Sequence, residues 1–201
     1  MPNNQTENIH LSGILMCRKP MAATAPLVFD IPRSGNEYPQ EYQSPAPFDA
    51  VRRSVSMYVE ELYGLAPAHG ATWLHALFPN VYIDANRHEL DVDPKFVVGA
   101  TPVPLQPTDK SARGMGLIAR VCGKGDVVLQ TAPITAEDLQ HRLDSYYWPY
   151  HNMLRDILAG FRASHGVAYH VSCHSMSSVG GKAVADPGRQ RPDFDIGPRH
   201  E

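Results

Sequence analysis

The stretch Val167-Ala-Tyr-His-Val-Ser-Cys-His-Ser-Met176 is a short apolar run that stops at Cys173-His174-Ser175. It has a counterpart in Leu27-Val-Phe-Asp-Ile31, which stops at Pro32-Arg33-Ser34-Gly35. Both runs have the length and the branched side chains of strands. Ligands of open α/β sheets bind at the carboxyl ends of strands, so the sequence predicts a site at these two loops. One loop offers a histidine and the other an arginine.

Further strands and two helices are predicted around these runs. The segment 48–65 has an apolar stripe at helical spacing and predicts one helix. The segment 135–165 predicts a second helix, capped by Thr135, kinked or divided at Pro149 and stopped by Gly166. This order of elements favours an α/β fold with a mixed sheet covered by helices. The strands are expected at Leu27–Ile31, Ala71–Leu77, Asn80–Ile83, Gly116–Val121, Val127–Leu129 and Ala168–Cys173.

The composition favours one domain and excludes several kinds of partner. The chain has 201 residues, of which 43% are hydrophobic, and a formal net charge of -3. A nucleic-acid-binding protein would have an excess of basic residues, and a membrane span would need about 20 apolar residues in a row, so we expect neither partner. Cys17, Cys122 and Cys173 lack metal-type spacing and predict reduced thiols in a cytoplasmic protein. Residues 1–24 lack periodicity and predict a poorly ordered tail.

Two groups of residues could carry chemistry. His174, at the end of an apolar strand, could ligate zinc or act as a base, or it could be a buried histidine satisfied by the backbone. The segment Tyr82-Ile-Asp-Ala-Asn-Arg87 delivers Asp84, Asn86 and Arg87 to a strand end, where arginine could grip a carboxylate. The alternative for this segment is a solvated turn with a surface salt bridge.

Two other segments favour structural interpretations. Arg113-Gly-Met-Gly116 could hold a small anion, but a β-turn is the simpler interpretation. The aromatic cluster Tyr146-Tyr-Trp-Pro-Tyr-His151 is expected in the core, with His151 at the surface or behind the site. The eight histidines other than His151 and His174 form no HxxxH or HExxH pattern among themselves.

Six blocks in the chain resemble, in order, the N-formylglutamate amidohydrolase family. The family patterns in question are F-D-S-P-H-S-G-x-x-Y-P, Y-I-D-V-N-R, K-S-x-x-G-x-G-L-I, Y-Y-x-P-Y-H, D-C-H-S-M and R-P-D-F-x-x-G-D-R. The counterparts are Phe29–Pro39, Tyr82–Arg87, Lys110–Ile118, Tyr146–His151, Ser172–Met176 and Arg191–Phe194 with Gly197 and Arg199.

The resemblance implies a phosphorylase/hydrolase-like three-layer α/β/α fold, akin to aspartoacylase and zinc carboxypeptidases, over residues 25–201. It also implies zinc-assisted hydrolysis of a small N-acyl amino acid, N-formyl-L-glutamate giving formate and glutamate. Carried over by position, His174 would be a metal ligand, and Asn86 and Arg87 would grip the substrate carboxylate.

The chain departs from the family pattern at the implied metal site. Arg33 stands where the family has a metal-binding histidine, and a guanidinium has no lone pair to donate. Ser56 and Ser172 stand at positions that are acidic in many members, and Pro198 replaces the aspartate of G-D-R. We also expect the chain to lack the family's C-terminal third, with the glutamate expected as general acid/base, and Glu37 has the wrong spacing to replace it.

These departures leave three functional hypotheses. The first is a divergent amidohydrolase with impaired hydrolysis and weak metal binding through His174. The second is a non-catalytic relative in which Arg33 and Arg87 hold a small carboxylate without metal. The third is a truncated gene product with little function.

Overall fold

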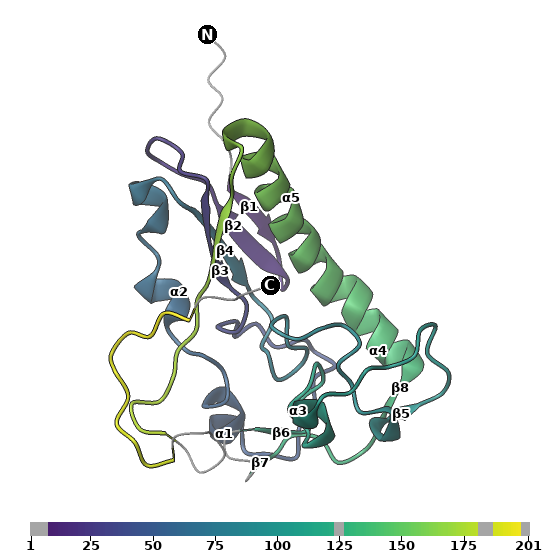
Figure 1. Cartoon of the computed structure of the whole chain (residues 1–201). Helices are drawn as coiled ribbons and strands as arrows, with labels where there is room; N and C mark the ends of the chain where they lie inside the picture. Colours follow the sequence, from purple (N-terminus) through teal and green to yellow (C-terminus); the bar gives the residue numbers. More distant parts are fainter. Residues whose placement is uncertain (1–7, 123–126, 181–186, 198–201) are drawn as a thin grey trace.

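The computed structural model describes residues 8–122, 127–180 and 187–197. Its centre is a five-stranded mixed sheet with the strand order β1-β2-β4-β3-β9 (Figure 1). The α/β class predicted from the sequence is confirmed, with a layer of helices against each face of the sheet. The strands are β1 Ile9–Leu11, β2 Leu15–Arg18, β3 Leu27–Ile31, β4 Thr72–Ala76 and β9 Tyr169–Ser172.

The middle of the sheet is parallel. Strand β3 runs parallel to β4 on one side, with Ile31 opposite His75, and to β9 on the other, with Asp30 opposite Ser172. Strands β2 and β1 continue the sheet in antiparallel order. Three strands therefore end at the same edge, and the loops that follow them can share one site.

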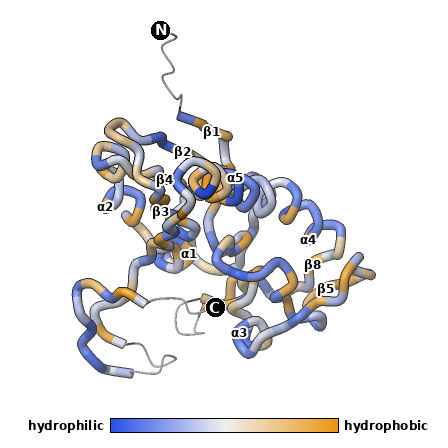
Figure 2. The backbone as a smooth tube through the Cα atoms, turned by 45° about the horizontal axis from the view of Figure 1, so that its top comes forward, coloured by the Kyte–Doolittle hydropathy of each residue, from blue (hydrophilic) through white to orange (hydrophobic). Residues whose placement is uncertain are grey.

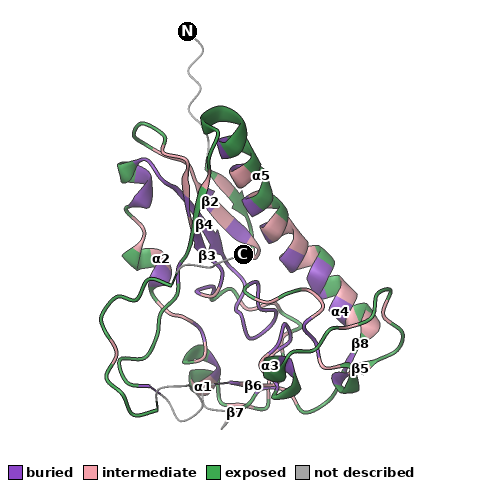
Figure 3. Ribbon diagram, viewed as in Figure 1, coloured by how far each residue is buried: buried purple, intermediate pink, exposed green. Residues whose placement is uncertain are grey.

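One long helical element covers one face of the sheet. It consists of α4 (Ala136–Arg142), a π-helical turn (Leu143–Tyr147) and α5 (Trp148–His165). Hydrophobic and hydrophilic residues alternate around α5, and its buried side faces the sheet (Figures 2 and 3). That side packs in a cluster with Val28 and Leu74 of the central strands, and its buried residues are Tyr150, Leu154, Ile157 and Phe161.

The ends of this element follow the predicted signals, and its regular α-helix is divided beside Pro149. The Thr135 hydroxyl accepts a hydrogen bond from the Asp138 N–H, 3.0 Å away, and Gly166 ends α5 with a φ of 73°. Proline lacks an N–H, and its ring clashes with the carbonyl four residues earlier in a regular α-helix. Here a π-helical turn separates α4 from α5, and α5 begins at Trp148 with Pro149 in its first turn, so the regular α-helix is divided just before the proline as predicted.

The opposite face is covered by shorter elements, α2 (Val59–Leu62) and a 3-10 turn, η1 (Ala66–His69). The prediction of one helix over 48–65 is wrong, because α1 (Phe48–Arg52) ends well before α2 begins. Between them Tyr58 adopts a left-handed φ of 67°, which no helix interior allows. Val51 and Val59 of the expected stripe are buried, whereas Tyr58 and Leu62 are exposed.

The prediction of a poorly ordered tail over residues 1–24 is wrong for residues 8–24, and residues 1–7 lie outside the described residues. Strands β1 and β2 form a hairpin, and β2 pairs with the central strand β4. Leu15 and Cys17 are fully buried in the main core. The strands are too short for a periodic pattern to show in the sequence.

The other strand predictions had mixed outcomes. Leu27–Ile31 is confirmed, and β4, β9 and β7 (Val127–Val128) lie within their predicted ranges. Asn80–Ile83 and Gly116–Val121 are wrong, since these segments form buried turns, with only Val121 of the second in a strand. Burial of Val81, Tyr82 and Ile83 gives them the composition of a strand without its geometry. The remaining elements are η2 Pro94–Phe96, β5 Val97–Val98, α3 Asp109–Ala112, β6 Val121–Cys122 and β8 Ile134–Thr135.

In the part of the chain that the structure describes, none of the helices has the length and apolar character needed to cross a bilayer.

Candidate functional site

The loops that follow β3, β4 and β9 lie at one edge of the sheet. Arg33 follows β3, His174 follows β9, and the segment after β4 supplies Asp84. The Oδ2 atom of Asp84 lies 3.4 Å from Nε of Arg33, and His174 is near enough for its charge to act on the same carboxylate. The structure thus brings the arginine and the histidine of the two strand ends together around an aspartate.

Asp84 is the centre of this group. Asp84 is only 4% exposed, so its negative charge needs positive or hydrogen-bonding partners to compensate for the loss of water. Oδ2 also lies 3.8 Å from Nε of Arg87, and Oδ1 accepts a hydrogen bond from the Asn86 N–H at 3.0 Å. Burial raises the pKa of Asp84, and the charge of Arg33, the Asn86 bond and the charge of Arg87 oppose that rise. This is a buried ion pair and not the solvated turn that was the alternative.

The two guanidiniums turn one edge toward Asp84 and remain partly open to solvent. Their Nε atoms are buried and have no hydrogen-bond partner among the described residues. The side chains as a whole are 30% exposed for Arg33 and 21% for Arg87. Two fixed positive charges therefore share one buried negative charge, and solvent reaches both side chains.

The loop that carries Asn86 and Arg87 rests on the start of α5. The Arg87 N–H donates to the Asp84 carbonyl at 3.0 Å, closing a tight turn. The Tyr147 hydroxyl donates to the Arg87 carbonyl at 2.8 Å, and Nε2 of His151 lies 3.0 Å from the Ala85 carbonyl oxygen. The predicted core position of the aromatic cluster is confirmed for Tyr147, which is buried. His151 supports the loop from behind, and Asn86 is exposed.

His174 is exposed, which contradicts the alternative of a buried histidine. Its Nε2 atom lies 3.1 Å from the Ser172 hydroxyl. A hydroxyl offers an imidazole one neutral hydrogen bond, whereas a carboxylate at this position would also supply charge. The neighbouring Cys173 is buried, and burial raises the pKa of its thiol to about 12, so the thiol is inert at neutral pH.

The zinc ion that the family resemblance implies does not fit these residues. The described ranges contain no group of three or more His, Cys, Asp or Glu side chains that could hold a metal ion. The Ser56 N–H donates to the Arg33 carbonyl at 3.0 Å, so positions 33 and 56 are neighbours as the family pattern requires. They carry a guanidinium and a hydroxyl, however, and a guanidinium repels a divalent cation.

Two other candidate groups have structural roles instead. Glu37 accepts a hydrogen bond from the Gly13 N–H at 2.9 Å, so its carboxylate fixes the N-terminal hairpin. Arg113 and Gly114 form the turn that ends α3, with Nε of Arg113 donating to the Asp109 carbonyl at 3.0 Å. These contacts favour the β-turn over an anion site. Pro198 and Arg199 lie outside the described residues.

The sequence did not reveal two polar clusters beside the site. The Ser34 hydroxyl donates to Oε2 of Glu60, next to His75, whose pKa burial lowers to about 4. A histidine within an apolar strand is the only signal for this cluster. In the other cluster, Asp30 accepts a hydrogen bond from the Tyr150 hydroxyl, and Nε2 of His170 lies 2.9 Å from its Oδ2. Both clusters stabilise the strand ends that carry Arg33 and His174.

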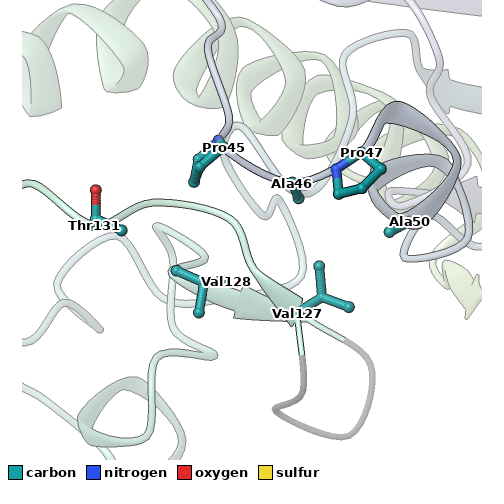
Figure 4. Close-up of a pocket in the computed structure, with 7 residues that line it drawn as sticks. All are labelled: Pro45, Ala46, Pro47, Ala50, Val127, Val128 and Thr131. Atoms are coloured by element: carbon teal, nitrogen blue, oxygen red, sulfur yellow. The ribbon is translucent and has the colours of Figure 1, made fainter.

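A hollow elsewhere in the molecule has no chemistry of its own. It lies between the segment Pro45–Ala50 and β7, with Val127, Val128 and Thr131 on its far side (Figure 4). Every lining side chain except that of Thr131 is apolar. This hollow uses none of the residues of the strand-end site.

Comparison with known proteins gives the family. The model of the N-formylglutamate amidohydrolase family matches residues 25–201. The chain belongs to the N-formylglutamate amidohydrolase family. The match covers all six sequence blocks, and it begins just before β3, so the hairpin β1–β2 precedes it.

Two solved structures resemble the chain. The crystal structure of N-formylglutamate amidohydrolase from Ralstonia eutropha JMP134 is 33% identical, covers 82% of this chain and has a TM-score of 0.78. The chain spans 58% of the length of that protein. The structure of the gene product Atu2144 from Agrobacterium tumefaciens is 18% identical and has a TM-score of 0.47. The alignment covers 89% of this chain and 60% of the Atu2144 chain. The comparison with curated proteins gave no match.

Proposed function

We propose that this family member binds a small carboxylate or N-acyl amino acid at the strand-end site and that hydrolysis there is impaired. The observation that carries the proposal is the ion-pair cluster in which Arg33 and Arg87 share the buried Asp84. Family membership supports an N-acyl amino acid such as N-formyl-L-glutamate as the ligand. A cytoplasmic location is part of the proposal, because Cys17, Cys122 and Cys173 are all unpaired.

Binding rests on the two guanidiniums. A guanidinium presents five N–H donors in a plane, and a carboxylate accepts two of them at once. Nε of Arg87 faces Asp84 at 3.8 Å, so the terminal nitrogens are the ones available to a ligand. Asn86 is next to it on the exposed side of the loop, where its amide can hydrogen-bond an acyl carbonyl. Tyr147 holds the loop from behind and so pre-forms the site.

Impaired hydrolysis follows from the groups that surround the same place. Activating water requires a group that takes a proton from it. Arg33 carries no basic lone pair, and Asp84 is buried between two guanidiniums, which stabilise its ionised form. His174 keeps a basic nitrogen, and the Ser172 hydroxyl, which carries no charge, lies 3.1 Å from its Nε2 atom. Ligand binding is therefore preserved better than turnover.

Calorimetry tests the binding proposal. We expect heat on titration with N-formyl-L-glutamate or glutamate, and we expect Arg87→Ala to weaken binding roughly tenfold or more, because a charge-assisted hydrogen bond contributes about 1.5–3 kcal/mol. Arg53→Ala removes an exposed arginine at the end of α1 and is the matched control. Formate release, measured in parallel with and without added zinc, should stay at the level of the buffer.

Two results would contradict this proposal. A folded protein that gives no heat with either ligand does not bind small carboxylates at this site. Steady formate release that Arg87→Ala abolishes and Arg53→Ala leaves intact would show that hydrolysis is unimpaired.

A further inference from the structure

Position 33 is one corner of a cluster whose other members are typical metal ligands. Asp84 Oδ2 lies 3.4 Å from Nε of Arg33, and the charge of His174 acts on the same carboxylate. Carboxylate oxygen and imidazole nitrogen are both common ligands of zinc and cobalt. Only two such side chains meet here, since the described residues contain no group of three. The third corner is a guanidinium.

We propose that the Arg33 guanidinium is the resident cation of this cluster: it neutralises Asp84 in place of a divalent ion and by itself keeps divalent metals out. Two properties of the side chain support this role. A guanidinium carries a permanent positive charge in proteins, so it repels an approaching metal ion. It also occupies the place of a metal beside the carboxylate, since its Nε atom lies 3.4 Å from Oδ2.

Arg87 neutralises Asp84 less fully than Arg33 does. Its Nε atom lies farther from Oδ2, at 3.8 Å against 3.4 Å for Arg33. Arg87 is also within electrostatic range of a second carboxylate, Asp91, so its charge has another partner. Removal of the charge at position 33 would therefore leave Asp84 with less than full compensation, and a buried carboxylate in that state attracts a cation.

The inference makes position 33 the determinant of metal binding. Arg33→His would place a neutral imidazole beside Asp84 and His174, which supplies two nitrogen ligands and one oxygen ligand and leaves a fourth position for water. Arg33→Lys keeps the positive charge and removes only the guanidinium geometry. The inference does not depend on the proposed function, because no carboxylate ligand takes part in it.

Titration with cobalt(II) tests the inference, because tetrahedral cobalt absorbs visible light and so reports its own coordination. We expect the wild-type protein and Arg33→Lys to show no such band, and Arg33→His to bind cobalt at least about tenfold more tightly than either. Adding His174→Ala to Arg33→His should remove the gain. Far-ultraviolet circular dichroism and a thermal melt verify that each variant is folded.

A tight cobalt complex of the wild-type protein would overturn the inference, and so would a folded Arg33→His variant that binds no better than Arg33→Lys. Arg33→Gln provides a second neutral variant in case Arg33→His fails to fold, and it should bind cobalt more tightly than Arg33→Lys. Calorimetry with N-formyl-L-glutamate is run without metal, so a failure there bears on the proposed function alone.

Discussion

His75 is a neutral histidine beside the strand-end site. The residue is 7% exposed, and its Nε2 atom has no hydrogen-bond partner among the described residues. Burial lowers its pKa from 6.5 to about 4, against the opposing charge of Glu60. The folded protein thus excludes a proton that the unfolded chain accepts.

This difference predicts a loss of stability in mild acid. Between pH 6.5 and about 4 the unfolded state binds more protons at His75 than the folded state, so the free energy of unfolding falls as the pH falls. The neutral His75 contributes on the order of 3 kcal/mol to the free energy of unfolding. This contribution is fully present above pH 6.5 and is lost as the pH falls to about 4. Urea unfolding of the wild type and of His75→Gln, measured at several pH values, should show a flatter dependence for the variant.

The control is His69→Gln, which changes an exposed histidine at the end of η1. It should keep the pH dependence of the wild type. Equal slopes for His75→Gln and the wild type would mean that the acid lability comes from other groups.

For single residues, the sequence predicts which side chains lie at strand ends, but not which of them form ion pairs. Arg33 and His174 each follow an apolar run, and parallel strands bring such residues to one edge. The counter-ion role of Asp84 is a tertiary contact between two loops, which no spacing within either loop encodes. The charge of Glu60 in α2 that acts on His75 is likewise a contact between distant segments.

Among the elements, α5 ends at a residue in the left-handed backbone region, which favours glycine. Gly166 has a φ of 73°, and no atom lies within 4 Å of the position that a Cβ would occupy there. The cost of a side chain at this position is therefore conformational and not steric. Gly160 lies inside the same helix and also has free space around it.

The two glycines predict opposite effects of the same substitution. Gly166→Ala should destabilise the protein by about 1 kcal/mol, because alanine is strained in the left-handed region. Gly160→Ala should stabilise it by about 0.5–1 kcal/mol, because glycine is a poor residue for a helix interior. Urea unfolding midpoints provide the measurement. Shifts of the same sign in both variants would contradict the assignment of Gly166 as the end of the helix.

The contrast between the two predicted helices shows which elements a sequence specifies locally. Thr135 and Gly166 bound their helix with signals that act within a few residues, and both were predicted. The segment 48–65 has a helical stripe, but the Ser56 N–H bonds to the carbonyl of Arg33, and Tyr58 turns left-handed. A hydrogen bond to a distant strand end thus overrides the local pattern.

For the whole molecule, the N-terminal hairpin completes the sheet. Strand β2 pairs with β4 along the full length of β2, from Leu15 opposite Ala76 to Arg18 opposite Trp73. The sequence signal that could have found it is the turn Leu11-Ser-Gly-Ile14, in which Gly13 has a φ of 72°. The family match begins at residue 25, after this hairpin. The hairpin thus belongs to the sheet of this chain although it lies outside the family match.

Leu15 gives a quantitative test of that integration. It is fully buried in the cluster that also contains Leu74 and Tyr150, so Leu15→Ala should leave a cavity between the hairpin and α5 and cost about 2–5 kcal/mol. Leu11→Ala in β1 is the matched control, since Leu11 is 41% exposed and should cost less than about 1 kcal/mol. If urea unfolding gave similar small costs for both variants, the hairpin would be an attachment to the folded core and not a part of it.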